Sequence, residues 1–496
     1  MRAPAYLSIG NVLTRLGRWE EAAESYWQAI NADPRFADAY NNLGIALSRM
    51  GREHGAIAAH AQAIEINPFH ANAYFNLGKL SAKFNEFATA SALLEKAIAI
   101  QPMHAYAYLE LGVLQQKAGL LEKAASSYRR SMELDPTRTA RGNLAGVLAL
   151  MGNSEGIDRL EQLVREQPLD AESHWNLGIG LLLHRRYEEG WREFEWRTEI
   201  PRFYKLHHRY RKPQWRGEPL QGTTILLFGE QGHGDTLQFL RYVPFVTGRG
   251  GRVVLDVPPL LCRLLQEFPG VSECVALGDP KPDFSTYASL MSLPHLLGAR
   301  AIPPPVAPAV QDATVFRERG TAGSAPSRLL QVGLAWAGAA SHQRDRLRSI
   351  PLAEWNSLAQ IEGVAFTALQ MGPPNAGAGS TGHRFHFVED CAGLADFAAL
   401  AAVLAKLDLI ITVDTAVAHL AGMMGKPVWI LLSNAVDWRW GLHSASTEWY
   451  PTARLFRQTT PADWKSVMAD VGYELQKRAR QTAPQKTMLE ALVDSP

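Results

Sequence analysis

The chain has 496 residues, which predicts about three domains, since domains usually span roughly 100–200 residues. It is 47% hydrophobic and carries 50 Lys and Arg against 49 Asp and Glu, a formal charge of +1. This balance excludes general disorder and gives no electrostatic reason to expect nucleic acid or an anionic membrane as partner. Three cysteines outside any CxxC spacing argue against a disulfide framework or a zinc site. Because no apolar run could span a bilayer and no secretory signal is evident, we expect a cytoplasmic protein.

A 34-residue repeat organises the first part of the chain. Each copy has a glycine, an alanine and a proline in fixed register: Gly10, Gly44, Gly78 and Gly112; Ala22, Ala56, Ala90 and Ala124; Pro34, Pro68, Pro102 and Pro136. Each unit predicts two amphipathic helices. The glycine marks a close helix contact, the alanine fills the tight crossing, and the proline ends the second helix.

These registers resemble the tetratricopeptide repeat (TPR) family over about residues 3–136. A degenerate copy ends at Pro168, and a sixth copy follows with the sequence HWNLGIGLLLHRRYEEGWREFEWR, in which Trp191 and Trp196 indicate the packed end of the array. We therefore expect an α-solenoid of about six repeats over residues 1–200, an architecture that offers a concave binding surface.

The sixth position of each first helix faces the concave groove in TPR proteins. Here it holds Ser8, Asn42, Asn76, Glu110 and Asn176. A side-chain amide can donate to a backbone carbonyl and accept from a backbone N–H together. The asparagines therefore favour an extended peptide, bound without regard to its side chains, and the row partly resembles the ladder of TPR-bearing O-GlcNAc transferases. The alternative is that these amides only cap or solvate the groove.

Residues 201–221, PRFYKLHHRYRKPQWRGEPLQ, break the helical pattern with three prolines and predict a linker. Six basic residues interleaved with aromatic ones resemble a strip that binds phosphate or nucleic acid. A connector that packs against two domains explains the same composition without a ligand, and we expect no nucleic-acid partner. A metal site at His207 and His208 lacks a third ligand at a sensible spacing.

Short apolar strands alternate with helices beyond residue 222, which predicts mostly parallel sheets covered on both faces. Residues 222–310 contain the strands TTILLF, RVVLDV and VSECVAL and the helices TLQFLRYVPFV and PPLLCRLLQEF. A Pro/Ala-rich crossover leads to residues 328–480, where LLQVGLAWAG, VAFTALQ, DLIITV and KPVWILL are strands. A last helix near Trp464–Leu475 is expected to cross back over the first half. Two Rossmann-like domains facing one another predict the α/β GT-B architecture, with ligands at the carboxyl ends of the strands.

The turn that begins at Asp414 is the strongest candidate for a nucleotide site. A strand delivers Asp414, and a helix opens directly after it, so the amides of Thr415, Ala416 and Val417 are expected to bind a diphosphate. Asp414 would then lie near sugar or ribose hydroxyls, and His419 on the inner face. The alternative is an Asp that caps a buried helix containing a satisfied histidine.

Two segments carry a second resemblance. DLIITVDTAVAHLAGMMGKPVWILL is similar to the donor-binding segment of glycosyltransferase family 9, the ADP-heptose lipopolysaccharide heptosyltransferases, and EQGHGDTLQFLRYVPFV is similar to their N-terminal Gly-Asp loop. Together with the repeats, YEEGWREFEWR, VGLAWAG, DWRWGL and EWYPTARLFRQ, these segments resemble bacterial TPR-glycosyltransferase fusions over nearly the whole chain.

The resemblance assigns roles to particular residues. It makes Asp235 the general base, which takes the proton of an acceptor hydroxyl as that hydroxyl attacks the anomeric carbon. A helix-capping role is the alternative for Asp235. The acceptor-side loop consists of Gln231, Gly232, His233 and Gly234. Helix amides and cations must stabilise the departing diphosphate, because no metal ion or other cofactor is expected. The loop HQRDRLRS supplies Arg344, Arg346 and Arg348 for this purpose.

The sequence also departs from its relatives. His233 occupies a position where an aliphatic residue is expected, and its alternative roles are a second acid/base, an acceptor ligand or a tolerated loop residue. Ala339 and Ala340 occupy the loop in which the fusions have Asn. Trp438, Arg439 and Trp440 follow a predicted strand. The two tryptophans are expected at a domain interface, and the alternative is that the three residues sandwich the nucleotide base.

The leading expectation is a glycosyltransferase, inverting by resemblance, that uses a nucleotide-sugar donor and recruits a protein acceptor through the repeats. The alternatives are a non-catalytic scaffold with a vestigial transferase domain, and a lipopolysaccharide glycosyltransferase.

Overall fold

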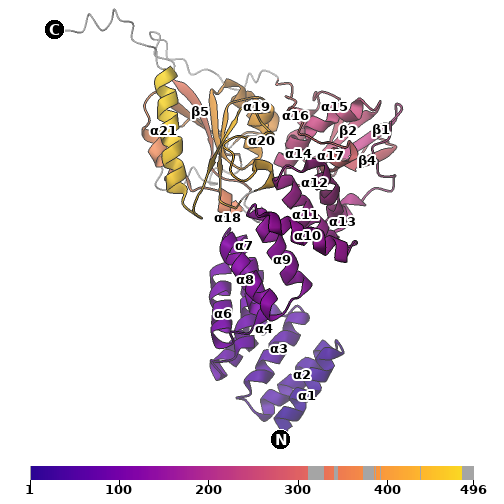
Figure 1. Cartoon of the computed structure of the whole chain (residues 1–496), viewed down its shortest axis with the longest axis vertical. Coiled ribbons are helices and arrows are strands. Elements are labelled where there is room, and N and C mark those ends of the chain that lie inside the picture. Colours follow the sequence, from indigo (N-terminus) through magenta and orange to yellow (C-terminus); the bar gives the residue numbers. More distant parts are fainter. Residues whose placement is uncertain are drawn as a thin grey trace, which may run out of the picture. The chain divides into compact units, whose positions relative to one another are not determined.

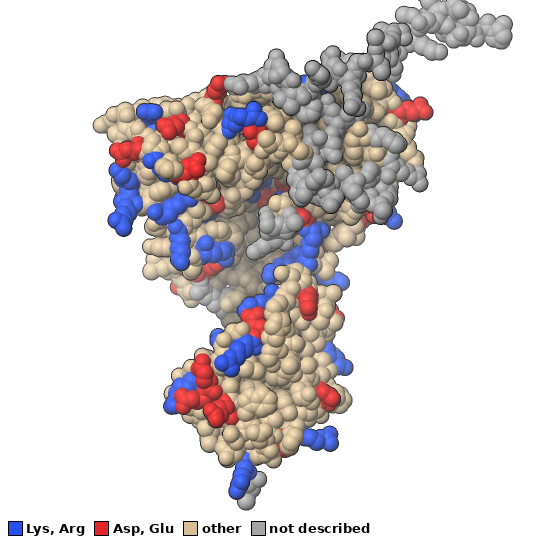
Figure 2. Space-filling model, turned by 180° about the vertical axis from the view of Figure 1, so that it is seen from behind, with Lys and Arg blue, Asp and Glu red and all other residues tan. Residues whose placement is uncertain are grey.

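The computed structural model describes residues 2–310, 329–339, 345–371, 385, 387–390, 393–435 and 437–482. Its residues fall into two units, Met1–Arg159 and Leu160–Pro496. The first is helical, and the second contains two parallel sheets (Figure 1). Both Lys and Arg and Asp and Glu are present on the face displayed in Figure 2, as the near-zero net charge leads one to expect. Among the described residues, no helix is long and apolar enough to cross a membrane.

Paired helices build the repeats. In chain order they are α1 (Arg2–Arg15), α2 (Trp19–Ala32), α3 (Ala37–Arg49), α4 (Glu53–Ile66), α5 (Ala71–Lys83), α6 (Phe87–Ile100), α7 (Ala105–Lys117), α8 (Leu121–Leu134), α9 (Arg138–Leu150), α10 (Ser154–Glu166), α11 (Ala171–Leu183) and α12 (Tyr187–Phe194). The second helices of the first four pairs end two residues before the repeated prolines, as predicted.

The repeat pattern has a direct packing cause. The alanines at the helix crossings are fully buried. A Cβ at Gly44 would lie 2.6 Å from the His60 ring, and one at Gly112 would lie 2.6 Å from the Tyr128 ring. Glycine at this position therefore lets a large side chain of the second helix pack directly on the backbone of the first.

The sixth repeat belongs to the second unit. Leu182, Trp191 and Phe194 share one hydrophobic core with side chains of the first sheet and its helices, and the Trp191 and Phe239 ring centroids lie 6.0 Å apart. The division between the two units at residue 159 therefore differs from the solenoid boundary predicted at residue 200.

The segment predicted as a linker is partly helical, which corrects the expectation of a broken helix. Helix α13 (Pro201–His207) begins with Pro201 at its first position, where the missing N–H costs no hydrogen bond. Beyond it, Trp215 is buried, and Arg209 donates to Asp256 at 2.8 Å. Tyr210 also donates to Asp256, so Arg209, Tyr210 and Trp215 pack against the first sheet, whereas Arg202 pairs with Glu172 of α11.

The first sheet has the order β3-β2-β1-β4, with all strands parallel: β1 (Thr224–Phe228), β2 (Arg252–Val257), β3 (Val271–Ala276) and β4 (Thr286–Ser289). Its helices are α14 (His233–Phe239), α15 (Val243–Thr247), α16 (Pro259–Leu265) and α17 (Leu293–Leu296). The single helix predicted over Thr236–Val246 begins at His233 instead. It is interrupted at Leu240–Tyr242 by a 3-10 turn, because Pro244, in the first turn of α15, has no N–H to donate to the Leu240 carbonyl.

The second sheet has the order β10-β9-β8-β5-β6-β7, again with all strands parallel: β5 (Leu330–Ala335), β6 (Val364–Ala368), β7 (Phe387–Asp390), β8 (Leu409–Val413), β9 (Val428–Leu432) and β10 (Ala453–Arg457). The helices are α18 (Asp345–Arg348), α19 (Phe397–Lys406), α20 (Ala416–Met423) and α21 (Trp464–Thr482), with 3-10 turns at Leu352–Gln360 and Trp438–Trp440. Numbered by chain order, this is the 3-2-1-4-5-6 order of doubly wound nucleotide-binding sheets.

Helix α21 packs on the second sheet and does not cross back over the first, which corrects the sequence expectation. Val467, Val471 and Leu475 share a core with strand residues such as Val332 and Ile411. The apolar face of α21 therefore completes the cover of its own sheet.

Candidate functional site

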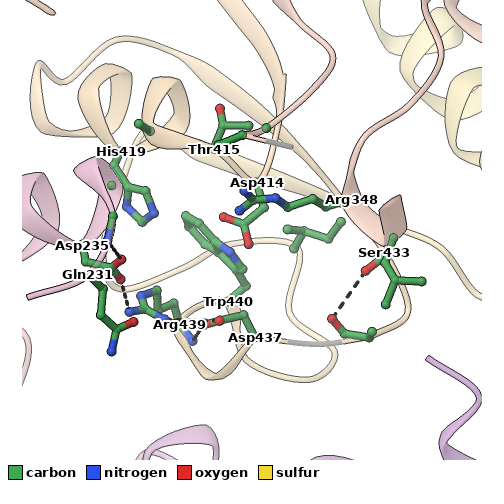
Figure 3. Close-up of a pocket in the computed structure, with 18 of the residues that line it drawn as sticks. Gln231, Asp235, Arg348, Asp414, Thr415, His419, Ser433, Asp437, Arg439 and Trp440 are labelled. Atoms are coloured by element: carbon green, nitrogen blue, oxygen red, sulfur yellow. Dashed lines mark hydrogen bonds and ion pairs between the residues drawn. The ribbon is translucent and has the colours of Figure 1, made fainter. Parts of the chain in front are cut away.

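A pocket of about 520 Å³ opens at the carboxyl ends of strands from both sheets. Its lining residues come from the loop after β1 in the first sheet and from the segments after β5, β8, β9 and β10 in the second (Figure 3). In a doubly wound sheet, connections from β5 and β8 leave in opposite directions and create a crevice between them. Gly338, after β5, and Asp414, after β8, line the pocket at this point.

Helix α20 presents its amino end to the pocket through Thr415 and Ala416. Thr415 is the N-cap residue, and its hydroxyl accepts a hydrogen bond from the Val417 amide at 3.3 Å. The cap is therefore Thr415, and the interpretation of Asp414 as the cap is wrong. The Val417 amide, a third expected donor to the diphosphate, is the group that bonds to this hydroxyl. The amides of Thr415 and Ala416 precede the first helical hydrogen bond and remain the donors of this turn.

The surroundings of Asp414 disfavour the charged form of its carboxyl group. Burial and the neighbouring Asp437 carboxylate raise the pKa of Asp414 to about 6, although Arg348 and Arg439 oppose the shift. Figure 3 shows the Arg348 side chain directed toward Asp414. A buried acid of this kind is typical of functional sites.

Asp235 lies in the first turn of α14 and faces the same pocket. Its Oδ2 accepts a hydrogen bond from the Gly232 amide at 2.9 Å, and its Oδ1 accepts one from Arg439. The N-cap residue of α14 is Gly232 and not Asp235, which corrects the N-cap alternative, although the Asp235 carboxylate stabilises the helix start from inside the first turn while it lines the pocket. Each carboxylate oxygen can accept a further hydrogen bond, so an acceptor hydroxyl can still donate to Asp235.

Arg439, which the sequence placed beside Trp438 and Trp440 after a strand, connects the two sheets across the pocket. Its guanidinium donates to Asp235 of the first half, to Asp437 of the second at 3.0 Å, and to Gln238 at 2.7 Å. The guanidinium also lies 4.4 Å from the centroid of the Trp438 ring, and its side chain is only 10% exposed. The DWRWGL motif contains Arg439, but the sequence interpretation of that motif rested on its two tryptophans.

Gly234 and His419 explain why the two halves approach so closely. A Cβ at Gly234 would lie 2.7 Å from His419 Cδ2 and 3.5 Å from Ala416 Cα. His419 hydrogen-bonds the Tyr450 hydroxyl at 2.8 Å and stacks on Trp440 with ring centroids 5.4 Å apart. Burial and the charge of Arg439 lower the pKa of His419 to about 3, so the ring is neutral at pH 7. His419 therefore has a hydrogen-bond partner and a stacking partner within the protein, and it also lines the pocket.

His233 also lines the pocket, together with Gln231 and Gly232. Its ring stacks on Phe397 of α19 with centroids 5.2 Å apart, and burial lowers its pKa. The residue that departs from the family pattern thus makes an aromatic contact between the two halves.

The three predicted phosphate-binding arginines separate in the structure. Arg348 lines the pocket, and its side chain is 19% exposed beside Asp345. Arg346 is exposed and is not part of the lining, while Arg344 lies outside the described residues. Arg457, at the end of β10, was missed. It lines the pocket with its Nη1 buried and without a hydrogen-bond partner in the described part of the chain.

The two predicted interface tryptophans differ in their surroundings. Trp438 packs among Trp191, Phe194 and Trp449, so the interface interpretation holds for it. Trp440 lines the pocket and stacks on His419.

Two of the groove asparagines bond to asparagines of the preceding repeat. The Asn42 amide donates to Asn11 at 2.9 Å, and the Asn76 amide donates to Asn41 at 3.0 Å. Part of the donor capacity expected for a peptide is therefore used between neighbouring repeats. Asn176 is part of the second unit.

Residues 10–51, 36–67 and 75–139 match tetratricopeptide repeats, and residues 376–482 match glycosyltransferase family 9 (heptosyltransferase). The chain carries TPR repeats and a family 9 glycosyltransferase domain. Of the site residues, Asp414, Asp437, Arg439 and Arg457 fall within the family 9 match, whereas Asp235 precedes it.

The chain is 25% identical over 342 residues to Protein FlbA of Caulobacter vibrioides. The alignment covers 60% of this chain and 53% of FlbA, so the chain spans about half the length of that relative. Among solved structures, it is similar to YrrB, a TPR protein with an unusual peptide-binding site, at 22% identity and a TM-score of 0.33, covering 37% of this chain and 96% of YrrB. It is also similar to TTC0263, a thermophilic TPR protein of Thermus thermophilus, at 21% identity and a TM-score of 0.31, covering 36% of this chain and 99% of TTC0263.

Within the described residues, no group of three or more His, Cys, Asp or Glu side chains is arranged to hold a metal ion. The site's charged groups are three carboxylates, Asp235, Asp414 and Asp437, and three guanidinium groups, Arg348, Arg439 and Arg457.

Proposed function

We propose that the chain transfers a sugar from a nucleoside-diphosphate sugar to an acceptor hydroxyl, within a GT-B arrangement of its two sheets. The observation that carries the proposal is that Asp235, from the first sheet, and the α20 amino end, from the second, line one pocket. A transferase needs a base on the acceptor side and an anion site on the donor side within reach of the same anomeric carbon.

The donor side is built for a diphosphate. The free amides of Thr415 and Ala416 offer hydrogen bonds and the positive end of the α20 dipole. Arg348 and Arg457 add positive charge on the pocket wall. These groups stabilise the charge that develops on the leaving diphosphate, and the proposed mechanism therefore requires no metal ion.

The acceptor side supplies the base. The acceptor oxygen attacks the anomeric carbon, the bond from that carbon to the diphosphate oxygen breaks, and Asp235 takes the hydroxyl proton. Attack from the face opposite the leaving group inverts the anomeric configuration. Arg439 holds the Asp235 carboxylate in place from the opposite half of the site.

The repeats provide the partner-binding surface, and we propose that they recruit a polypeptide acceptor in the cytoplasm. The amides of Asn42 and Asn76 already donate to Asn11 and Asn41 of the preceding repeat, yet each amide nitrogen carries two donors and keeps one for a peptide.

Calorimetric titration with UDP, ADP, GDP and CDP tests the donor site, and intact-protein mass spectrometry of candidate acceptors tests transfer. We expect one diphosphate to bind, and Asp235→Asn to retain that binding while losing transfer. A folded protein that binds none of the four would refute the donor site. Unchanged transfer by Asp235→Asn would refute the assigned base, and partner binding without diphosphate binding or transfer would indicate a scaffold.

A further inference from the structure

A buried ion pair lies directly behind the pocket loop. Glu230, the residue before the pocket-lining segment Gln231–Asp235, pairs with Arg197, which follows the last helix of the sixth repeat. The side chains of Arg197 and Glu230 are both 0% exposed. The Arg197 Nη2 lies 2.7 Å from Glu230 Oε2, and its Nε lies 2.9 Å from Oε1, so the contact is bidentate.

Further hydrogen bonds fix both partners. Arg197 also donates to Glu195 at 2.8 Å and to Ser292 at 2.9 Å. Glu230 accepts from the Ser289 hydroxyl at 2.7 Å, at the end of β4, and lies 3.3 Å from His207 Nε2. Although burial raises the pKa of Glu230, the charge of Arg197 and the hydrogen bond from His207 hold it well below its usual value. The pair is therefore ionised and anchored to three separate segments.

Such an anchor constrains the loop in a particular way. The chain from Glu230 to Asp235 is short and contains two glycines, so its own backbone preferences do not define one conformation. A planar guanidinium that binds a carboxylate through two parallel hydrogen bonds fixes both position and orientation.

We propose that Arg197 and Glu230 are positioning residues, through which the end of the repeat array sets the geometry of the loop that carries Asp235. The inference rests on the proposed role of Asp235 as the base. It also gives a structural role to Arg197, the last residue of the FEWR sequence at the end of the sixth repeat, and to Glu230, the glutamate of GEQGHGD. The sixth repeat is then a part of the catalytic unit, distinct in role from the repeats before it.

The test compares Glu230→Gln, Arg197→Met and a double variant that combines Arg197→Met with Glu230→Leu. Removal of one partner strands a buried charge, whereas replacement of both partners by apolar groups avoids that cost. We expect the double variant to unfold at a higher urea concentration than either single variant and still to turn over about 100-fold more slowly, since displacement of a catalytic group by about 1 Å costs that much. The dissociation constant for the nucleoside diphosphate should change less than about three-fold, because Arg348 and α20 are untouched.

A matched control is Asp256→Asn. Asp256 is also buried and paired, with Arg209 at 2.8 Å and Lys281 at 3.0 Å, but it lies at the end of the neighbouring strand β2. We expect this variant to lose stability and to keep its turnover. If it slows turnover as much as the double variant does, the effect is structural and the proposal is overturned.

Amide hydrogen exchange in residues 231–236 provides a readout that needs no activity. We expect exchange there to rise at least about ten-fold in the double variant and to remain unchanged in Asp256→Asn. Unchanged exchange in the double variant overturns the positioning role, whatever the enzyme does. If the wild-type protein transfers no sugar while the loop loosens as expected, the proposed function fails and the structural anchor stands.

Discussion

Replacing Asp414 by Asn should stabilise the protein at neutral pH while impairing its function. The pKa of Asp414 is raised from an ordinary value near 3.8 to about 6 by burial and by the Asp437 carboxylate. The folded state therefore binds this proton more tightly than the unfolded state, and stability is lost as pH rises between about 4 and 6. A shift of about two pKa units corresponds to about 3 kcal/mol above pH 7. Asn carries no charge and avoids this cost.

Urea unfolding followed by tryptophan fluorescence measures the difference. We expect Asp414→Asn to be more stable by up to about 3 kcal/mol at pH 8 and by only about 1 kcal/mol at pH 4.5. The control is Asp396→Asn in the same unit. The hydrogen bond from Arg263 lowers the pKa of Asp396, and its carboxylate also accepts from the Ala399 amide at 2.9 Å, so this change should destabilise at pH 8. An Asp414→Asn variant no more stable than wild type at pH 8, or equally more stable at both pH values, would refute the reasoning.

Three further outcomes follow from the packing and the pocket. Gly234→Ala should destabilise by about 1–3 kcal/mol and lower turnover, because its Cβ would lie 2.7 Å from His419; wild-type unfolding and kinetics would contradict the close approach. Deletion of residues 1–159 should leave a protein that unfolds cooperatively and still binds the diphosphate. Deletion of residues 1–200 should instead expose the core that the sixth repeat covers and cause aggregation. Size-exclusion chromatography and calorimetry distinguish the two proteins, and equal behaviour of both would refute the role of the sixth repeat. Arg348→Met should weaken diphosphate binding about 10-fold or more with little change in stability, since one charge-assisted hydrogen bond contributes about 1.5–3 kcal/mol, and unchanged affinity in calorimetry would exclude this arginine from the donor site.

Local patterns predicted much of this molecule. The 34-residue spacing gave the helix pairs and their ends, because each glycine and proline acts on neighbours within its own unit. The alternation of apolar runs and helices predicted parallel sheets, and the turn after DLIITV indicated a pocket-lining segment. Errors arose where a local signal had two outcomes. Thr415 and not Asp414 caps α20, since the backbone geometry of the turn selects which side chain reaches the amides.

The sequence by itself determined the repeats, the sheet-forming segments and two carboxylates of the site, Asp235 and Asp414. Each of these features depends on residues that lie close together along the chain. Only the tertiary structure decided that Arg439 joins Asp235, 204 positions away, that Arg197 pairs with Glu230, and that the sixth repeat packs with the first sheet and its helices. These contacts depend on strand order and on which side chains share a buried volume. A single sequence carries no local signal for either, since any of many arginines could have supplied the charge.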